Sequence, residues 1–330
     1  MRQAKTRRYR LRAFLLAAAL AVVILPSALA QNYGEWLSLS HLDWGVNGDT
    51  EDMNPILTRD GLSLYFTRTL RPAGGVPSNY NYVAHRRGVE GPWELPVVLG
   101  QLGDYFVVSA DGHRAFFGRK LPDGTSDLFM SRRRDQNDDS GWGAPENLGP
   151  RINTSADEYF ASLYEDEATG ESLLYFTSNR DGNDDIYVST SWEDGVFSDP
   201  VPVAELNSDG VDRQIHVRRD GLECVFMSNR PGSMKNPAGN DSYDLWVATR
   251  ASTSDPWSTP ANMGEPINSG RHEGAPSYSF DGSQLYFHAA MREGNFDTRD
   301  VKGVGCLSSP TCYFDIWVAT REKVRGTERR

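Results

Sequence analysis

Five acidic residues recur at matching places along the chain and are the first candidates for chemistry. Four of them stand five residues after an asparagine, at Asn47, Asn153, Asn207 and Asn268. Carboxylates gathered at close quarters raise one another's pKa and favour a cation or a ligand rich in hydroxyl or amine groups. The five acids are Asp52, Asp104, Glu158, Asp212 and Glu273.

The same recurrence also fits a structural role, in which each carboxylate accepts hydrogen bonds from its own repeat. A feature present in every unit favours that role, whereas catalysis needs asymmetry. Asymmetry occurs in "DRQIHV" (212–217), where alternation along a strand places Asp212, Gln214 and His216 on one side. His216 is then either a general base or metal ligand, or a polar wall residue bound to water.

We therefore expect the ligand contacts to come from the five acids and from three basic residues beside them. If the protein is an enzyme, the catalytic candidates are Asp212, Glu273, Glu158 and His216, because glycoside chemistry needs two acids about 5–10 Å apart. The complete ligand-contact set is Asp52, Asp104, Glu158, Asp212, Arg213, His216, His272 and Glu273.

The elements that position these residues are repeated strands. Five segments follow one plan of strand, tight turn, strand, loop and strand, and four of them carry an Asp-Gly pair at the turn, at residues 60–61, 111–112, 220–221 and 281–282. The flanking runs are rich in Tyr, Phe, Val, Ile and Leu, as strands are. A fourth, outer strand follows most units, seen best in the Trp-to-Asn stretches 142–153 and 257–268.

Four strands repeated about every 55–60 residues predict an all-β, five-bladed β-propeller with four-stranded antiparallel blades. The expected blades are 51–103, 104–157, 158–211, 212–272 and 273–321. The last unit lacks its outer strand, and the missing piece stands at residues 36–48. We therefore expect the N-terminal strand to complete the fifth blade beside residues 316–320 and to close the ring, which removes exposed sheet edges.

The repeats resemble the WD40-like, TolB-type propeller family of secreted bacterial proteins. The likeness is clearest in "DGLECVFMSNR" (220–230) followed by "DLWVATR" (244–250), and in "SNRDG" (178–182) followed by "DIYV" (185–188). Blade 1 departs with Asn81 in place of the aspartate found at 127, 185, 244 and 315, and blade 5 has "HAAMR" in place of "SNR". The simplest role for these aspartates is a contact within the blade to the Arg or Ser of "SNR". The resemblance implies the fold and leaves function open.

Residues 1–30 have the pattern of a cleaved signal peptide, with a basic start, a short apolar run and small residues before Ala30. The alternative is a membrane anchor, for which the apolar run is short. Residues 31–330 would then form one periplasmic or secreted domain with no membrane insertion. The signal segment holds six of the 34 basic residues and none of the 45 acids, which leaves a net charge of −17. Such acidity argues against nucleic-acid binding and permits a monomer.

Three cysteines are present, and we expect Cys306 and Cys312 to be joined across a short loop in an oxidising compartment. Cys224 lies in an apolar run and fits a buried position. No cofactor is expected, although the Asp/Asn-rich loops at 134–141 and 180–185 leave weak calcium binding open. The long loops at 71–81, 230–243 and 292–313 should emerge on one face, where binding specificity is usually built.

These features predict a binding or scaffold module for a protein partner or a glycan. The alternative is a carbohydrate-active enzyme, a glycoside hydrolase or lyase, that uses carboxylates of the central channel. A weaker third possibility is a calcium-dependent structural module.

Overall fold

The computed structural model describes residues 32–43, 45–72, 75–167, 169–193, 195–236, 239–292 and 312–324. Within these ranges the chain forms 21 β-strands and no helix. The predicted signal peptide lies outside the described residues. So do Cys306 and the side chain of Cys312, so the expected disulfide stays a prediction.

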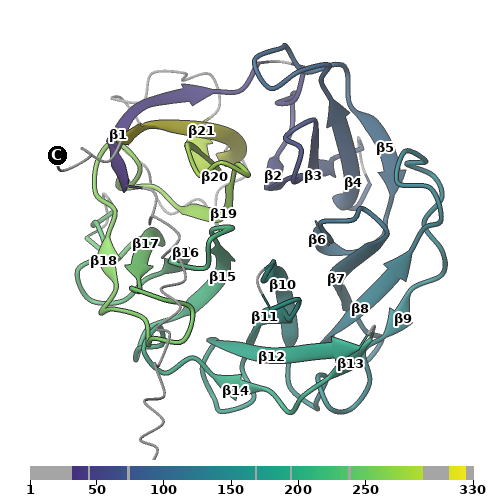
Figure 1. The fold of residues 1–330 in the computed structure, drawn as a ribbon. Helices are drawn as coiled ribbons and strands as arrows, with labels where there is room; N and C mark the ends of the chain where they lie inside the picture. The colour runs from purple at the N-terminus through teal and green to yellow at the C-terminus, as the bar shows by residue number, and fades with distance from the viewer. Residues whose placement is uncertain are drawn as a thin grey trace, which may run out of the picture. The chain divides into compact units, whose positions relative to one another are not determined.

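The strands form five antiparallel sheets arranged as the blades of a ring, which confirms the predicted five-bladed β-propeller (Figure 1). Blade 1 contains β2 (Asp52–Leu57), β3 (Ser63–Leu70), β4 (Ser78–His85) and β5 (Val97–Gly100). Blade 2 contains β6 (Asp104–Val108), β7 (Arg114–Lys120), β8 (Ser126–Arg132) and β9 (Glu146–Asn147). Blade 3 contains β10 (Glu158–Glu165), β11 (Ser172–Ser178) and β12 (Asp185–Glu193), and its outer strand is split into β13 (Val196–Phe197) and β14 (Val201–Pro202). Blade 4 contains β15 (Asp212–Val217), β16 (Glu223–Ser228), β17 (Asp244–Thr249) and β18 (Ala261–Asn262).

Blade 5 is built from both ends of the propeller and closes the ring. Its sheet has the order β1 (Asn32–His41), β21 (Cys312–Val324), β20 (Gln284–Arg292) and β19 (Glu273–Tyr278). Trp36 pairs with Arg321 and His41 pairs with Trp317. In Figure 1 the purple β1 accordingly lies along the yellow-green β21. The predicted closure by the N-terminal strand is confirmed.

An asparagine precedes four of the five first strands and ties together the blade that comes before that strand. The Asn47 side chain accepts a hydrogen bond from Ile316 N at 2.8 Å and donates one to Ile316 O at 3.0 Å. The amide thus copies the backbone pairing of a neighbouring strand, which satisfies buried groups where the outer strand ends. Asn153, Asn207 and Asn268 bind the third strands of blades 2, 3 and 4 in the same way.

An arginine at the end of the third strand holds each Asp-Gly turn. Arg86 Nε donates to Gly61 O at 2.7 Å, and its guanidinium lies 4.3 Å from the centre of the Trp93 ring. Gly61 has a φ of +70°, which an L side chain rarely adopts. Equivalent arginines serve the turns of blades 2, 4 and 5 at Arg133, Arg250 and Arg321. Blade 3 has Ser191 at this place.

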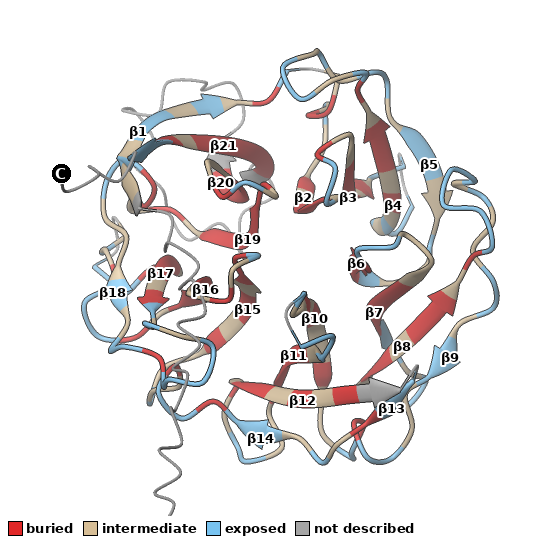
Figure 2. Ribbon diagram, in the orientation of Figure 1, coloured by how far each residue is buried: buried red, intermediate tan, exposed pale blue. Residues whose placement is uncertain are grey.

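The hydrophobic core lies between neighbouring blades. Residues of the inner strands are buried, whereas the outer strands β5, β9, β14 and β18 are mainly exposed (Figure 2). One cluster joins blades 1, 2 and 3 through Tyr65, Phe106, Phe117 and Leu174. Cys224 is buried within the blade 3–blade 4 cluster, and burial raises the pKa of its thiol.

Candidate functional site

The recurring first-strand acids face their own blades. Asp52 is fully buried and receives Arg68 Nε at 2.7 Å and Gly48 N at 2.7 Å. Burial nevertheless raises its pKa to about 6. Glu158, equally buried, accepts from Ser178 Oγ at 2.8 Å and from Arg180 Nη2 at 3.2 Å. Asp212 meets Arg230 Nη2 at 2.5 Å and Ser208 N at 2.6 Å.

The arginines of "SNR" therefore pair with the first-strand acids rather than with the aspartates of the third strands. Three of those aspartates have other partners, whereas the buried Oδ1 of Asp185 has none in the described structure. Asp127 accepts from Asn147 Nδ2 at 2.7 Å, Asp244 accepts from Asn262 Nδ2 at 2.6 Å, and Asp315 contacts His41 Nε2 at 2.9 Å. They bind the third strand to the outer strand, so this expectation of an Asp–Arg or Asp–Ser contact is corrected.

The three arginines that pair with first-strand acids are Arg68, Arg180 and Arg230. Each occupies a site that we call an arginine slot. We define the slot by four partners of the arginine. They are the first-strand acid, the backbone carbonyl of the residue before the recurring asparagine, and one aromatic ring from each of the second and third strands. Arg230 contacts the Leu206 carbonyl, and its guanidinium lies 4.9 Å from the Phe226 ring centre and 5.2 Å from that of Trp246. The slots of blades 1 and 3 hold Arg68 and Arg180 with the same four types of partner.

Asp104 does not belong with the other acids. Each first strand has a bulge containing one residue of positive φ, and in blade 2 that residue is Tyr105, at +55°. Asp104 pairs with Gly118 and matches Met53 and Arg213 of blades 1 and 4. The acid position is occupied by Gly103, where a Cβ would lie 2.5 Å from the Gly118 carbonyl. Asp104 itself is exposed.

Glu273 differs from its counterparts because no arginine contacts it among the described side chains. Its Oε1 accepts from Ser269 Oγ at 2.6 Å, and its buried Oε2 has no hydrogen-bond partner within the described structure. Burial raises the pKa of Glu273 to about 8; Asp244 raises it further, while Ser269 and Arg271 oppose the shift. Glu273 lines a cavity of 490 Å³.

Arg213 and His272 lie in a packed group near the starts of the first strands of blades 4 and 5. Arg213 pairs with Asp184, which also accepts from Tyr159 OH at 2.5 Å. His272 packs against Tyr243 and Phe314, and its Nε2 lies 3.3 Å from Met227 Sδ. Burial lowers the pKa of His272 to about 4.

Sequence reasoning missed His288, which stands next to this group. Its ring centre lies 5.9 Å from that of His272, and its Nδ1 accepts a hydrogen bond from Asn54 N at 3.3 Å. The residue is 3% exposed, and burial lowers its pKa well below the ordinary value. Its place in "HAAMR", the altered second strand of blade 5, is the one sequence signal for it.

His216 lies toward the other end of its strand. It lines a cavity of 110 Å³ whose walls come from the first-strand regions of all five blades, and burial lowers its pKa to about 4. Glu273 lines a different cavity, and neither cavity is lined by Asp212 or Glu158. The four catalytic candidates are therefore not brought together.

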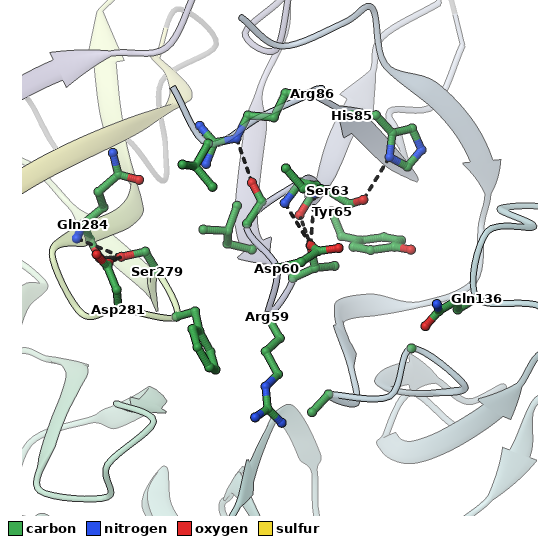
Figure 3. A pocket seen from close by; sticks show the side chains of 18 of the residues that line it. Arg59, Asp60, Ser63, Tyr65, His85, Arg86, Gln136, Ser279, Asp281 and Gln284 are labelled. Carbon is green, nitrogen blue, oxygen red and sulfur yellow. Dashed lines mark hydrogen bonds between the residues drawn. The ribbon is translucent and has the colours of Figure 1, made fainter. Parts of the chain in front are cut away.

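A larger cavity opens among the Asp-Gly turns of blades 5, 1 and 2, and we call it the turn-face cavity (Figure 3). It has a volume of 810 Å³. Two of its carboxylates serve the turns. Asp60 accepts from Thr58 Oγ1 at 2.7 Å, and Asp281 accepts from Ser283 Oγ at 2.6 Å. Although burial opposes it, hydrogen bonds from Ser283 and Ser279 hold the pKa of Asp281 below its ordinary value.

Other groups on the wall of the turn-face cavity are suited to a ligand. Gln136 is exposed and Gln284 half-buried, on opposite sides of the view in Figure 3. Arg59 lies 5.0 Å from the centre of the Phe280 ring and pairs with Glu167, toward the channel. His85 contacts Ser63 Oγ at 2.9 Å and Asp139 at 2.8 Å, and the Asp139 hydrogen bond raises its pKa. These residues come from three blades, so no single motif marks them.

No family model matches this chain, and no curated protein matches it either. Among solved structures it is similar to a thermostable family-43 glycoside hydrolase, with 14% identity over 88% of this chain and 94% of the other and a TM-score of 0.54. An endo-arabinase from Bacteroides thetaiotaomicron also shows 14% identity, over 87% and 99%, with a TM-score of 0.54. TolB from Acinetobacter baumannii shows 15% identity over 84% of this chain and 56% of that one, with a TM-score of 0.45. At these identities the likeness to the two hydrolase structures, whose TM-scores exceed 0.5, shows a shared fold alone.

Neither a membrane-spanning helix nor a metal cluster is present among the described residues. They contain no helix long and apolar enough to cross a membrane. They also contain no group of three or more His, Cys, Asp or Glu side chains arranged to hold a metal ion.

Proposed function

We propose that this propeller is a binding module that recognises a glycan in the turn-face cavity and catalyses no reaction. The observation that carries this proposal is the contrast between the cavity and the acids. The cavity is open and lined by both polar and apolar side chains, whereas Asp52, Glu158 and Asp212 are buried against arginines of their own blades. A glycoside hydrolase needs two accessible carboxyl groups with different protonation states. Asp60 and Asp281 both accept hydrogen bonds within turns, and those to Asp281 lower its pKa and favour its ionised form.

The lining of the cavity suits a polyhydroxylated ligand. The side-chain amides of Gln136, Asn137 and Gln284 offer donors and acceptors for hydroxyl groups. Phe280 adds an apolar ring that already contacts the guanidinium groups of Arg59 and Arg219, and Arg59 supplies a guanidinium. The volume of 810 Å³ falls within the range of about 300–1,000 Å³ that is usual for small-ligand sites. The predicted signal peptide supports action in the periplasm or outside the cell.

A binding and hydrolysis screen tests this function. We expect the purified protein to bind at least one class of soluble oligosaccharide by isothermal titration calorimetry, with no new reducing ends released. The double variant Gln136→Ala/Gln284→Ala should bind at least fivefold more weakly. Gln101→Ala removes an exposed glutamine outside the cavity and should bind normally.

Three outcomes would contradict this function. Binding that survives the double variant would exclude the turn-face cavity as the site. If the protein bound a peptide or a protein but no glycan, the proposed ligand class would be wrong. Release of products would favour the alternative, a glycoside hydrolase or lyase.

One observation favours that alternative. Glu273 lines its 490 Å³ cavity together with Glu265, and its pKa of about 8 keeps the carboxyl protonated near neutral pH. A protonated carboxyl is what a general acid needs, and Glu265 would be the second carboxylate. Under this alternative, Glu273→Gln would abolish product release from an active preparation.

A further inference from the structure

We propose that blade 5 holds an arginine slot without its arginine and that this slot binds the guanidinium group of a ligand. The site lies at the start of β19, whereas the turn-face cavity lies beyond the end of that strand. It is independent of the function proposed for the turn-face cavity.

The filled slots of blades 1, 3 and 4 define what the site recognises. In each, a guanidinium donates to a buried carboxylate and to a backbone carbonyl, between two aromatic rings. The guanidinium carbon lies 4.8–5.4 Å from the ring centres, within the reach of a cation–π interaction. A planar cation with several N–H donors satisfies all of these partners together.

Blade 5 keeps the walls of this slot. Glu273 takes the place of the acid, Ile267 precedes Asn268 as Leu206 precedes Asn207, and Phe287 and Trp317 take the places of Phe226 and Trp246. The five blade 5 residues of this comparison line the 490 Å³ cavity: Ile267, Asn268, Glu273, Phe287 and Trp317. The space that an arginine fills in the other blades is therefore a cavity here.

Among the described side chains of blade 5, the missing element is the arginine itself. Asp212 pairs with Ser228, and Arg230 follows two residues later; Glu273 pairs with Ala289, and the residue two positions later is Met291. The "HAAMR" departure of the second strand thus removes the cation at this register. Arg271 lines the cavity, and its guanidinium lies 6.0 Å from the Trp317 ring centre, but no hydrogen bond joins it to Glu273 in the described structure.

The state of Glu273 shows what the slot lacks. Its Oε2 is buried and has no hydrogen-bond partner among the described residues. A buried polar atom without a partner costs about 1–3 kcal/mol, which a ligand that donates to it would recover. The cavity is larger than one guanidinium group, so it also accommodates the chain that carries it. Both an arginine side chain of a protein partner and a small guanidine compound fit this chemistry.

Binding of a cation should be linked to a proton. Glu273 must ionise to pair with a guanidinium, and its pKa is about 8 in the empty slot. The charged and polar groups that face it are Asp244, Arg271 and Ser269. At pH 7 most of the carboxyl is protonated, so binding releases a proton, and the affinity rises with pH until about pH 8.

Titration calorimetry with agmatine, a small guanidinium compound, tests the slot. We expect agmatine to bind the purified protein, and its analogue in which a neutral urea group replaces the guanidinium to bind at least tenfold more weakly. Titrations at pH 7 in phosphate and in Tris should differ in heat by the amount expected for release of most of one proton. The peptide Gly-Arg-Gly distinguishes an arginine of a protein partner from a small guanidine compound as the natural ligand. Tighter binding of the peptide than of agmatine indicates the protein partner.

Two variants locate the binding. Glu273→Gln removes the carboxylate and should weaken agmatine binding at least tenfold and abolish the proton release. Met291→Arg restores the arginine of blades 3 and 4, so it should block binding and raise the melting temperature. If Met291→Arg does not fold, Glu273→Gln still decides the matter.

Several results would overturn the site. The site is excluded if agmatine fails to bind the wild-type protein, or if it binds both variants as tightly as it binds the wild type.

Discussion

In blade 4, the first-strand acid Asp212 is buried against Arg230, whereas in blade 5 the corresponding Glu273 has no arginine partner among the described side chains. Both acids stand at the same register, five residues after an asparagine that binds the third strand. The chain therefore enters the first strands of both blades from the same kind of anchor on the preceding blade. The difference concerns only the charge that neutralises the acid.

This difference separates two uses of one repeated position. A buried carboxylate costs several kcal/mol unless a partner neutralises it, and blades 1, 3 and 4 supply that partner from their own chain. Blade 5 instead leaves a carboxyl whose raised pKa favours the neutral form. A repeat that loses one internal partner without losing its fold becomes a place where an external group can bind.

The largest expected effect comes from making blade 4 resemble blade 5. Arg230→Ala leaves Asp212 buried without its cation and should lower the free energy of unfolding by about 3–5 kcal/mol, as measured by urea denaturation at pH 7. Arg219→Ala is the matched control, because its pair with Glu167 is about 40% exposed. That surface change should cost less than about 1 kcal/mol. A loss no larger than that of the control would show that the slot arginine is dispensable.

The second effect is the pH dependence of stability, which should differ between Glu273 of blade 5 and an arginine-paired acid, Glu158 of blade 3. The pKa of Glu273 is about 8 in the folded protein and 4.5 ordinarily, so the unfolded chain loses this proton first as the pH rises. The wild type should lose stability between about pH 4.5 and 8 on this account. Glu273→Gln removes that loss, and it should gain about 2–4 kcal/mol over the wild type at pH 8 and little at pH 4.

Glu158→Gln provides the contrasting variant in blade 3. It breaks a buried ion pair with Arg180, so it should destabilise the protein at pH 8, where Glu273→Gln stabilises it. Urea denaturation at pH 4, 6 and 8 measures both. If the two variants changed stability in the same direction at pH 8, the blades would not differ as described.

Most of the fold could be predicted because it is repeated. The spacing of strands and Asp-Gly turns predicted five blades, and the missing outer strand of the last unit predicted its pairing with β1. The register within blade 2 could not be predicted. Tyr105 adopts a positive φ without being glycine, so no residue type signals that Gly103, rather than Asp104, stands at the acid position.

The sites were predictable only in part. The acids were found as a set, but their arginine partners come from another strand of the blade, and a sequence pattern does not show which acid an arginine meets. The turn-face cavity joins Arg59, Gln136 and Gln284 from three blades, so its residues share no motif. The substitution of "HAAMR" for "SNR" was visible in the sequence, but its meaning depends on the slot that Arg180 and Arg230 reveal.

The smallest expected effect tests whether blade 5 is otherwise equivalent to blade 4. Asn47→Ala and Asn268→Ala each remove an amide that makes two buried hydrogen bonds to a third strand, and each should cost about 1–3 kcal/mol in urea denaturation. Asn268 binds within a continuous blade, whereas Asn47 holds the N-terminal strand in the ring. Equal losses in the free energy of unfolding would mean that the N-terminal strand is held in blade 5 as firmly as the outer strand is held in blade 4. The arginine slot would then be the feature that distinguishes blade 5. A much smaller loss for Asn47→Ala would mean that the ring opens between β1 and β21 before the protein unfolds. The low cost of that opening would then also explain why blade 5 tolerates Glu273, a buried acid with no arginine partner among the described side chains.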